Sequence, residues 1–206
     1  MILGTDLEPH KQYHLRLVVN DPDEMMISEG DLTQFSCDVI VNAANSELIP
    51  GGGVDGALHR AGGPAIREEC LAIRRARGPL APGDAVATTA GALPAKKVIH
   101  TVGPVWCGGE AGEPTILRSC YQSSARLADD LGFTSIAFPA ISTGVYGYPL
   151  KPAAEVAVRT LLDEVTNARH LCVVWLVLFD REAFTAFALE ASSVGADRKL
   201  QMGLGY

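Results

Sequence analysis

The sequence contains no long hydrophobic run. Its longest apolar stretch, Leu171 to Phe179, is far shorter than the roughly 20 residues that a membrane-spanning helix requires. The N-terminal segment carries Asp6, Glu8 and Pro9 where a signal peptide has a basic start and a continuous apolar core. These two absences predict a soluble protein that is neither inserted in a membrane nor exported, and we expect it to be cytoplasmic.

Paired cysteines and basic clusters are also missing. The five cysteines are widely separated, and there is no CxxC pair and no histidine at metal-ligand spacing. We therefore expect neither a disulfide framework nor a zinc site, and we interpret Cys120 and Cys172 as core thiols in a helix and a strand. The formal net charge of -7 disfavours attraction to a nucleic-acid backbone, which needs clustered lysine and arginine.

Two common nucleotide-binding motifs are absent. No GxxxxGK[ST] is present, which excludes a P-loop NTPase, and no GxGxxG follows the first strand-like segment with an acid about twenty residues on, which disfavours a Rossmann dehydrogenase. The chain has 206 residues, of which 48% are hydrophobic and 20% charged. This length and composition are typical of one ordinary globular domain.

Strand-like and helix-like segments alternate along the chain. The strand-like segments have the apolar, β-branched composition of buried strands; they are HLRLVV, MMIS, DVIVNAA, AVATTAG, KVIHTVG, SIAFPAI and LCVVWLVLF. The helix-like segments have apolar residues three and four apart; they are PAIREECLAIRRAR, EPTILRSCYQSSARLADDLG and PLKPAAEVAVRTLLDEVTNAR. The pattern predicts an α/β fold, a three-layer α/β/α sandwich with a mixed sheet whose first two strands form an antiparallel edge. We expect the tail QMGLGY to be poorly ordered.

Two glycine-rich stretches follow strand-like segments. GGGVDG lies between DVIVNAA and a helix, and STGVYGYP lies between SIAFPAI and the helix that starts near Pro149. Ligands of open α/β sheets bind beyond the carboxyl ends of strands. Successive N–H groups in such turns, together with helix N-termini, form anion sites. Together the stretches predict a two-sided phosphate cradle, and the alternative for each is a tight turn without a ligand.

Asn45 and Asp55 flank the first glycine run. An amide both donates and accepts, which suits the hydroxyls of a ribose. The dipole of the following helix favours an ionised Asp55, which can orient or deprotonate a water for attack on an ester at that sugar. The alternative for Asp55 is a helix cap without catalysis. His59, one turn later, could face Asp55 or only pack beside it, and we interpret His100 as structural.

Four stretches carry a family resemblance: GDLT (30–33), VNAAN (41–45) with GGGVDGALHRAGG, IHTVGP (99–104) and ISTGVYGYP (141–149). In this order they resemble the macrodomain family, specifically its MacroD-like ADP-ribosyl hydrolase branch. The resemblance covers roughly residues 15–190. It implies a six- or seven-stranded mixed sheet in a single macrodomain over residues 1–206, with a short N-terminal extension and a C-terminal tail.

The resemblance also implies a function. Enzymes of this branch bind ADP-ribose at the strand ends and hydrolyse ADP-ribosyl esters, converting O-acetyl-ADP-ribose to ADP-ribose and acetate and removing mono-ADP-ribose from protein Asp or Glu. No metal or other cofactor is implied. The implied partners are ADP-ribose, its esters and mono-ADP-ribosylated proteins. No membrane is implied, and nucleic acid only as an ADP-ribosylated substrate.

Three residues take the adenine side of the site under this resemblance. Asp31 accepts a hydrogen bond from the adenine amino group beside the Leu32 backbone, and Phe179 packs near the ring. Asp31 has an alternative as the N-cap of a short helical turn, a role that aspartate favours by itself. The alternative for Phe179 is simple core packing at the end of a strand.

The resemblance places the remaining site residues around the diphosphate and the distal ribose. Asn45 and Asp55 take the catalytic positions. The residues that contact the diphosphate, with Tyr146 near the distal ribose, are Gly53, Val54, Ser142, Thr143, Gly144, Val145 and Tyr146. Whether Asp55 is a general base or only positions the water stays open at this stage.

Pro50 departs from the family pattern, in which four glycines commonly precede VDG. Proline fixes φ and removes an N–H, which we interpret as a stiffening of the loop that affects turnover or leaving-group access. Three function classes stay open: an ester hydrolase, a non-catalytic ADP-ribose reader, and an RNA- or nucleotide-binding module with salt-dependent binding to single strands. Asp55, an acid that binding-only macrodomains commonly lack, favours the hydrolase.

Overall fold

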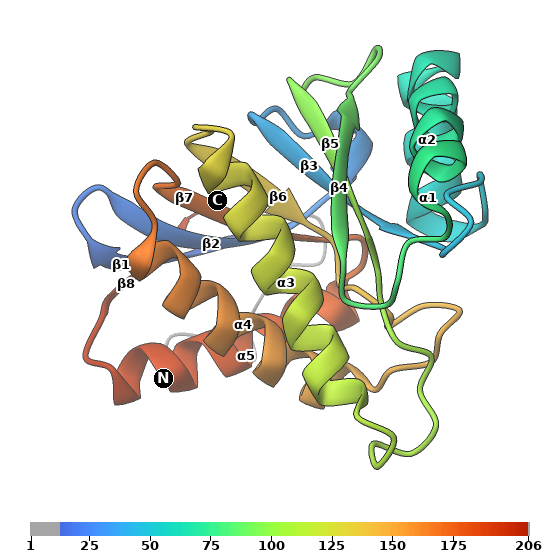
Figure 1. The fold of residues 1–206 in the computed structure, drawn as a ribbon. Coiled ribbons are helices and arrows are strands. Elements are labelled where there is room, and N and C mark those ends of the chain that lie inside the picture. The colour runs from blue at the N-terminus through green and yellow to red at the C-terminus, as the bar shows by residue number, and fades with distance from the viewer. Residues whose placement is uncertain (1–12, 206) are drawn as a thin grey trace.

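The computed structural model describes residues 13–205, so the expected N-terminal extension lies almost entirely outside the described part of the chain. Within these residues one mixed sheet has eight strands in the order β4-β5-β3-β6-β7-β2-β1-β8 (Figure 1). The five central strands run parallel to one another, and β4, β1 and β8 pair in the antiparallel sense. The strands are β1 (His14–Asn20), β2 (Asp23–Glu29), β3 (Val39–Ala44), β4 (Ala85–Thr89), β5 (Lys97–Val102), β6 (Ser135–Phe138), β7 (Val173–Leu178) and β8 (Gln201–Gly205).

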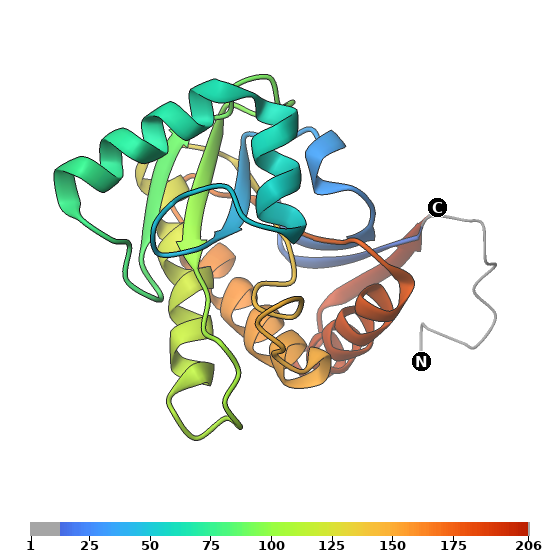
Figure 2. The same ribbon diagram turned by 90° about the vertical axis from the view of Figure 1, so that its right-hand side faces the viewer.

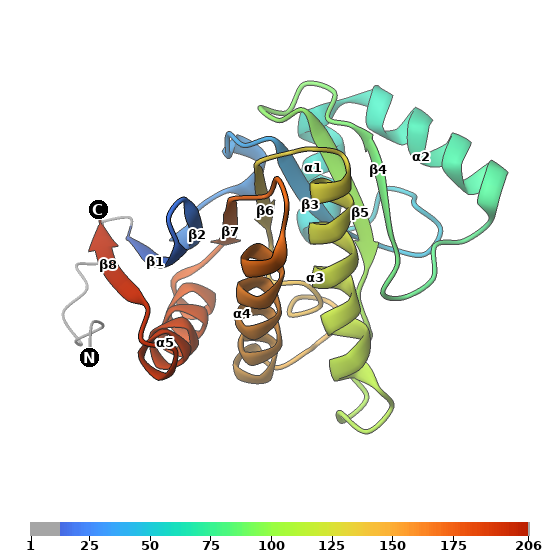
Figure 3. The same ribbon diagram turned by 60° about the vertical axis from the view of Figure 1, so that its left-hand side comes forward.

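Five α-helices and one 3₁₀ turn accompany the sheet within residues 13–205. Helices α3, α4 and α5 lie side by side over one face, and α1 and α2 lie on the other face (Figure 3). These elements are η1 (Leu32–Gln34), α1 (Gly53–Gly62), α2 (Pro64–Arg77), α3 (Glu113–Asp130), α4 (Leu150–Asn167) and α5 (Arg181–Asp197). The arrangement confirms the predicted three-layer α/β/α sandwich.

Alternation along the central strands divides the buried side chains between two cores. In β3, Val39 and Val41 pack in the core under α3, α4 and α5, whereas Ile40 packs in the core under α1 and α2. In β5, Ile99 packs in the core under α3, α4 and α5, and Val98 packs in the core under α1 and α2. Both faces of these strands are therefore buried, which is why their sequences are almost continuously apolar.

The number of strands and the fate of the tail differ from the sequence-based predictions. The sheet has eight strands rather than six or seven, because residues 201–205 of the tail pair antiparallel with β1 instead of being poorly ordered. Met202 and Leu204 pack against the core, and Gln201 is exposed. The tail therefore covers the edge that β1 would otherwise present, and β1 and β2 are antiparallel partners without forming the edge themselves.

Helix α5 and Cys172 also differ from the sequence-based predictions. No helix was predicted after LCVVWLVLF, but α5 begins after Asp180, whose side chain caps the helix by accepting a hydrogen bond from the N–H of Ala183 at 2.8 Å. Cys172 precedes β7 and is only half-buried, so its interpretation as a core thiol in a strand is wrong. Cys120 is buried in α3 as predicted. Among residues 13–205, no helix combines the length and apolarity needed to cross a bilayer.

Candidate active site

The carboxyl ends of five parallel strands meet at one edge of the sheet. The loops that follow β3 and β6 lie at this edge and are seen from the front in Figure 2, the first in blue to cyan and the second in gold. Between them is a cavity of about 270 Å³, lined by residues 43–45, 51–55, 140, 142 and 144–146, and by Gly103. This is the crevice position in which α/β sheets bind ligands.

A second, larger groove of about 480 Å³ lies between α3 and α4. Its acidic groups already have partners. Asp129 accepts hydrogen bonds from the backbone N–H groups of residues 169–171, and Glu164 pairs with Arg126. The polar groups of this groove are therefore satisfied by the protein, and the cavity at the strand ends is the better candidate site.

Asp55 forms part of the cavity wall at the start of α1. Its side chain is almost fully buried, and its Oδ2 accepts a hydrogen bond from the N–H of Gly51 at 2.5 Å. Oδ1 accepts from Nδ2 of Asn42, also at 2.5 Å. Each carboxylate oxygen has two lone pairs, so both oxygens keep capacity for a further donor. The N-cap of α1 is Gly52, and no side chain caps the helix. The alternative role of Asp55 as a cap is therefore limited to its bond with the N–H of Gly51, in the loop before the helix.

Asn42 was not singled out from the sequence, where it lies inside the apolar strand VIVNAA. It is fully buried on β3, directly opposite His100 of β5 in the register of the two strands. Besides its bond to Asp55, the Nδ2 of Asn42 lies 3.1 Å from Nδ1 of His100. Only the pairing of β3 with β5 brings these residues together, so no local sequence signal could have identified them.

Asn45 lines the cavity as predicted, but its amide is engaged in its own loop. Nδ2 donates to the carbonyl of Ile49 at 2.7 Å, and Oδ1 accepts from the N–H of Glu47 at 3.2 Å. These bonds hold the loop in front of the glycine run. One N–H of the amide has no partner in these contacts, and this is the donor that Asn45 can offer to a ligand.

The loop after β6 presents unpaired donors to the cavity. The N–H groups of Gly144, Val145 and Tyr146 have no hydrogen-bond acceptor among the described residues. Ser142 has a left-handed φ of 67° and is buried, and its Oγ has no partner within residues 13–205. Thr143 is bonded to Ala140 and does not line the cavity. Consecutive free amides form a concave anion site.

The start of α1 supplies donors from the opposite side of the cavity. Gly53 and Val54 occupy the first two positions of the helix, where N–H groups have no intrahelical acceptor. Gly53 has a φ of 56°, which glycine adopts without strain. The structure thus places the two predicted halves of the cradle around one cavity, with an ionisable carboxylate at its wall.

A buried acid holds the loop after β5, which in turn contacts the loop after β6. Glu113 accepts hydrogen bonds from the N–H groups of Cys107, Gly109 and Ala111, and these N–H groups, with its own, lower its pKa. The loop so held includes Trp106, which donates its N–H to the carbonyl of Tyr146 at 2.9 Å. Glu113 was not predicted from the sequence, although an acid in the first turn of a helix after a glycine-rich loop is a signal that could have indicated it.

The residues expected around adenine lie outside the cavity but beside one another. Asp31 and Phe179 follow β2 and β7, which pair in parallel up to Glu29 and Leu178, and the N–H of Gly30 donates to the carbonyl of Leu178. Asp31 caps η1 by accepting from the N–H and hydroxyl of Thr33, so the alternative role is present.

The predictions for Phe179 and Leu32, also expected near adenine, have different outcomes. Phe179 is 84% exposed, so its alternative as a core residue is wrong. Leu32 is buried in the core under α1 and α2, so the predicted contact with a ligand would involve its backbone and not its side chain.

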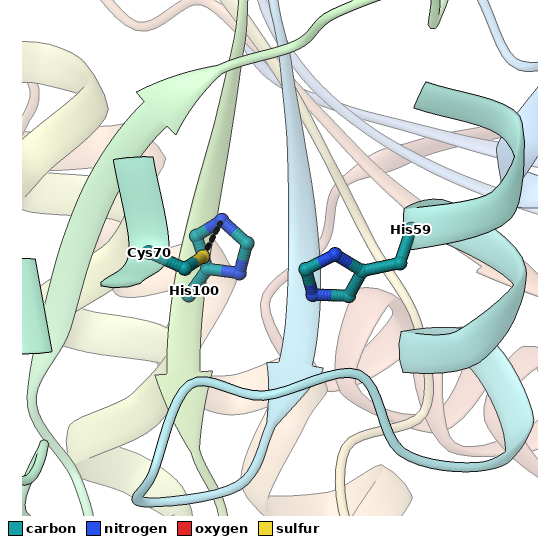
Figure 4. Close-up of side chains that lie close together, drawn as sticks. All are labelled: His59, Cys70 and His100. Atoms are coloured by element: carbon teal, nitrogen blue, oxygen red, sulfur yellow. Dashed lines mark hydrogen bonds between the residues drawn. The ribbon is translucent and has the colours of Figure 1, made fainter. Parts of the chain in front are cut away.

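Three residues of metal-binding types lie together next to Asp55. His59 of α1, Cys70 of α2 and His100 of β5 are buried, and their ligand atoms lie within 4.8 Å of one another (Figure 4). The sequence spacing gave no sign of this cluster, because its members come from three elements. His59 also lies with Nε2 3.5 Å from Oδ1 of Asp55, so of the two interpretations left open by the sequence it does face Asp55.

The contacts of the cluster do not favour a metal ion. Both nitrogens of His100 already have neighbours, Asn42 at Nδ1 and the hydroxyl of Thr88 at Nε2, 2.9 Å away. Burial raises the pKa of the Cys70 thiol to about 12, whereas a metal-binding cysteine must lose its proton. We interpret the cluster as part of the hydrogen-bonded layer beneath α1.

The chain was compared with known proteins. Residues 41–157 match the sequence pattern of the Macro domain family. The chain is 52% identical over 173 residues to a protein of Salmonella gallinarum named O-acetyl-ADP-ribose deacetylase, across 84% of this chain and 97% of that protein. A protein of the same name from Escherichia coli is 53% identical over 156 residues, across 76% of this chain and 88% of its own length.

Solved structures agree with this assignment. The Oceanobacillus iheyensis macrodomain with ADP is similar with a TM-score of 0.87 at 34% identity, covering 91% of this chain and 99% of that chain. The Trypanosoma brucei macrodomain in complex with ADP-ribose has a TM-score of 0.73 at 36% identity, covering 80% of this chain and 68% of that chain. Fold, site and sequence similarity together show that the chain belongs to the macrodomain family.

Proposed function

We propose that this protein binds ADP-ribose and hydrolyses ADP-ribosyl esters, with O-acetyl-ADP-ribose as a substrate. One observation carries the proposal: two sets of backbone N–H groups without acceptors among residues 13–205 line a cavity whose wall also includes Asp55. Relatives at about half identity that are named O-acetyl-ADP-ribose deacetylase, and macrodomain structures with ADP and ADP-ribose, support the same ligand and reaction.

The ligand occupies the site along the edge of the sheet. Gly53 and Val54 on one side and Gly144, Val145 and Tyr146 on the other donate to the diphosphate, because these residues line the cavity and their N–H groups have no acceptor among residues 13–205. Adenine extends toward Asp31 and the exposed ring of Phe179, which follow neighbouring strand ends. The distal ribose then lies between Tyr146, Asn45 and Asp55.

The reaction uses the carboxylate that the loop and Asn42 hold in place. Asp55 orients a water molecule toward the ester carbonyl carbon and accepts a proton from it as the new C–O bond forms. The tetrahedral intermediate then breaks its bond to the ribose oxygen, which takes up a proton, and acetate and ADP-ribose leave. The same steps release ADP-ribose from an ester with protein Asp or Glu, which we propose as a second substrate class.

A non-catalytic reader is the alternative function. It would use the same cradle, and Pro50 is the feature that favours it, because a stiffer loop in front of Asp55 restricts the approach of water and the departure of the acyl group. Tight binding of ADP-ribose without release of product would identify a reader.

The test compares the wild type with Asp55→Ala. Both are incubated with ADP-ribose esterified to acetate and to a protein glutamate, and free ADP-ribose is followed by mass spectrometry while calorimetry measures ADP-ribose binding. We expect the wild type to release ADP-ribose, and the variant to lose this activity by about 10²-fold or more while binding stays within about tenfold. Asp163→Ala, in the groove between α3 and α4, is the matched control and keeps full activity.

Equal activity in Asp55→Ala would remove this residue from the mechanism. Binding without hydrolysis in the wild type would replace the hydrolase with the reader.

A further inference from the structure

A chain of hydrogen bonds runs from β4 through β5 and β3 to Asp55. The hydroxyl of Thr88 lies 2.9 Å from Nε2 of His100, Nδ1 of His100 lies 3.1 Å from Nδ2 of Asn42, and the same Nδ2 lies 2.5 Å from Oδ1 of Asp55. Thr88, His100 and Asn42 are at most 1% exposed. None of the three lines the cavity, and the hydrogen bond from Asn42 to Asp55 joins them to it.

The direction of each bond follows from chemistry. An ionised carboxylate only accepts hydrogen bonds, so Asn42 must turn its NH2 group toward Asp55, and the same group then faces His100. Nδ1 of His100 must therefore be the acceptor and carries no proton. The proton of the neutral ring lies on Nε2 and is donated to Thr88, whose own hydroxyl donates to the carbonyl of Thr89 at 2.9 Å.

His100 keeps this neutral form over the working range of pH. Burial, with a smaller effect of the nearby His59, lowers its pKa to about 3. A neutral imidazole has two tautomers, and the partner at one nitrogen decides which nitrogen carries the proton. Two groups face Nε2 here, the hydroxyl of Thr88 at 2.9 Å and the sulfur of Cys70 at 3.6 Å (Figure 4). Sulfur is the weaker hydrogen-bonding group, so the hydroxyl of Thr88 is the partner that decides the tautomer.

The orientation of Asn42 depends on its NH2 end alone. Its Oδ1 is buried and has no hydrogen-bond partner within residues 13–205. If the proton of His100 moved to Nδ1, it would point at the NH2 group of Asn42. Asn42 would then turn its Oδ1 toward His100, and the present bond from its Nδ2 to Asp55 would be lost.

We propose that His100 and Thr88 are positioning residues for Asp55. Thr88 selects the Nε2-protonated tautomer of His100, which fixes the amide of Asn42 and thereby the carboxylate that faces the bound ester. This inference rests on the proposed hydrolase function. It assigns a role in the reaction to a hydroxyl on β4 that contacts neither the substrate nor Asp55.

Thr88→Val is the decisive variant, because valine has the shape of threonine without the hydroxyl. We expect kcat for release of acetate from O-acetyl-ADP-ribose to fall about fivefold, the effect of one neutral hydrogen bond, with the Kd for ADP-ribose within about twofold of wild type. Thr88→Ser retains the hydroxyl and restores kcat. Thr101→Val is the matched control: Thr101 is a fully buried threonine on β5 whose hydroxyl donates to the carbonyl of Asp84, outside this chain of bonds.

The tautomer is measured directly by ¹⁵N NMR of the histidine rings, assigned with His100→Asn. We expect the wild type to show a protonated Nε2 and an unprotonated Nδ1 at His100, and Thr88→Val to show the other tautomer in part. His100→Asn, whose Oδ1 can still accept from Asn42, should retain more activity than His100→Leu.

Three results would overturn the proposal: a protonated Nδ1 at His100 in the wild type, an unchanged kcat in Thr88→Val, or equal losses of kcat in Thr88→Val and Thr101→Val. If the wild type bound ADP-ribose but released no acetate, the proposed function would fail, and the NMR measurement would still decide whether Thr88 selects the tautomer.

Discussion

Gly56 faces the carbonyl oxygen of Gly51 so closely that a Cβ on Gly56 would lie 2.5 Å from that oxygen. The second turn of α1 is therefore in direct backbone contact with the loop that precedes the helix. The same loop donates its Gly51 N–H to Asp55. Loop and helix thus hold each other at the position where the carboxylate meets the cavity.

Gly56→Ala tests this contact. Alanine is favoured over glycine in a helix by about 1 kcal/mol, but here its methyl group would press on backbone that cannot rotate away. We expect a net destabilisation of about 1–3 kcal/mol in urea unfolding and a clear loss of ADP-ribose affinity by calorimetry. Gly203→Ala, where a Cβ meets nothing within 4 Å, is the control. A stabilised Gly56→Ala with normal affinity would show that the loop yields easily.

Phe179→Ala tests the adenine side of the site. The ring is 84% exposed, so its removal should leave the free energy of unfolding unchanged. Stacking of a base on an aromatic ring contributes about 1–3 kcal/mol, so we expect the Kd for ADP-ribose to rise on the order of tenfold. Leu189→Ala removes a different exposed apolar side chain, one that lies on α5, and should change neither the free energy of unfolding nor the Kd. Unchanged affinity in Phe179→Ala would place adenine elsewhere.

Glu113→Gln tests the support of the phosphate loop. The pKa of Glu113 is lowered in the folded protein, so its stabilising effect is complete above the ordinary glutamate pKa and is lost as the pH falls through the lowered value. Urea unfolding at a series of pH values should show the wild type more stable than Glu113→Gln at neutral pH, with the difference shrinking in acid. A constant difference at all pH values would contradict a role for the ionised form.

Pro50→Gly tests the departure from the family pattern. Pro50 is exposed and does not line the cavity, so ADP-ribose affinity should stay within about twofold. The unfolded chain gains conformational freedom, which should lower the free energy of unfolding by about 1 kcal/mol. We expect kcat for ester hydrolysis to change by more than about threefold, and a parallel change in affinity would instead assign Pro50 to binding.

The parts of the site that were predicted from the sequence share one property. Asp55, Gly53 and the residues of STGVYG have local sequence signals, because a glycine run directly after an apolar strand is typical of a ligand-binding turn. Asn42 and His100 have none, since each is a polar residue inside a strand and only the register of β3 and β5 places them opposite each other. Their role depends on a contact between residues 58 positions apart.

The elements of the fold also differ in whether they have a local sequence signal. Buried central strands have continuous apolar, β-branched runs and amphipathic helices have a helical period, and those elements were predicted. Strand β8 has no such signal, because QMGLG has two glycines and no β-branched residue, and it forms a strand by pairing with the free edge of β1. Helix α5 carries threonine, serine and glycine among its apolar residues, which weakens the helical pattern that the sheet nevertheless stabilises by packing.

The pairing of β1 with β8 also has a consequence for synthesis. His14 lies opposite Gly205, so the first strand of this sheet to be synthesised pairs with the last strand of the sheet. Until residue 205 has emerged, the outer hydrogen-bonding groups of β1 stay available to other chains. Nascent copies translated close together on one messenger can therefore pair with one another through β1. Once residues 201–205 pair with β1, this edge is no longer available for such aggregation.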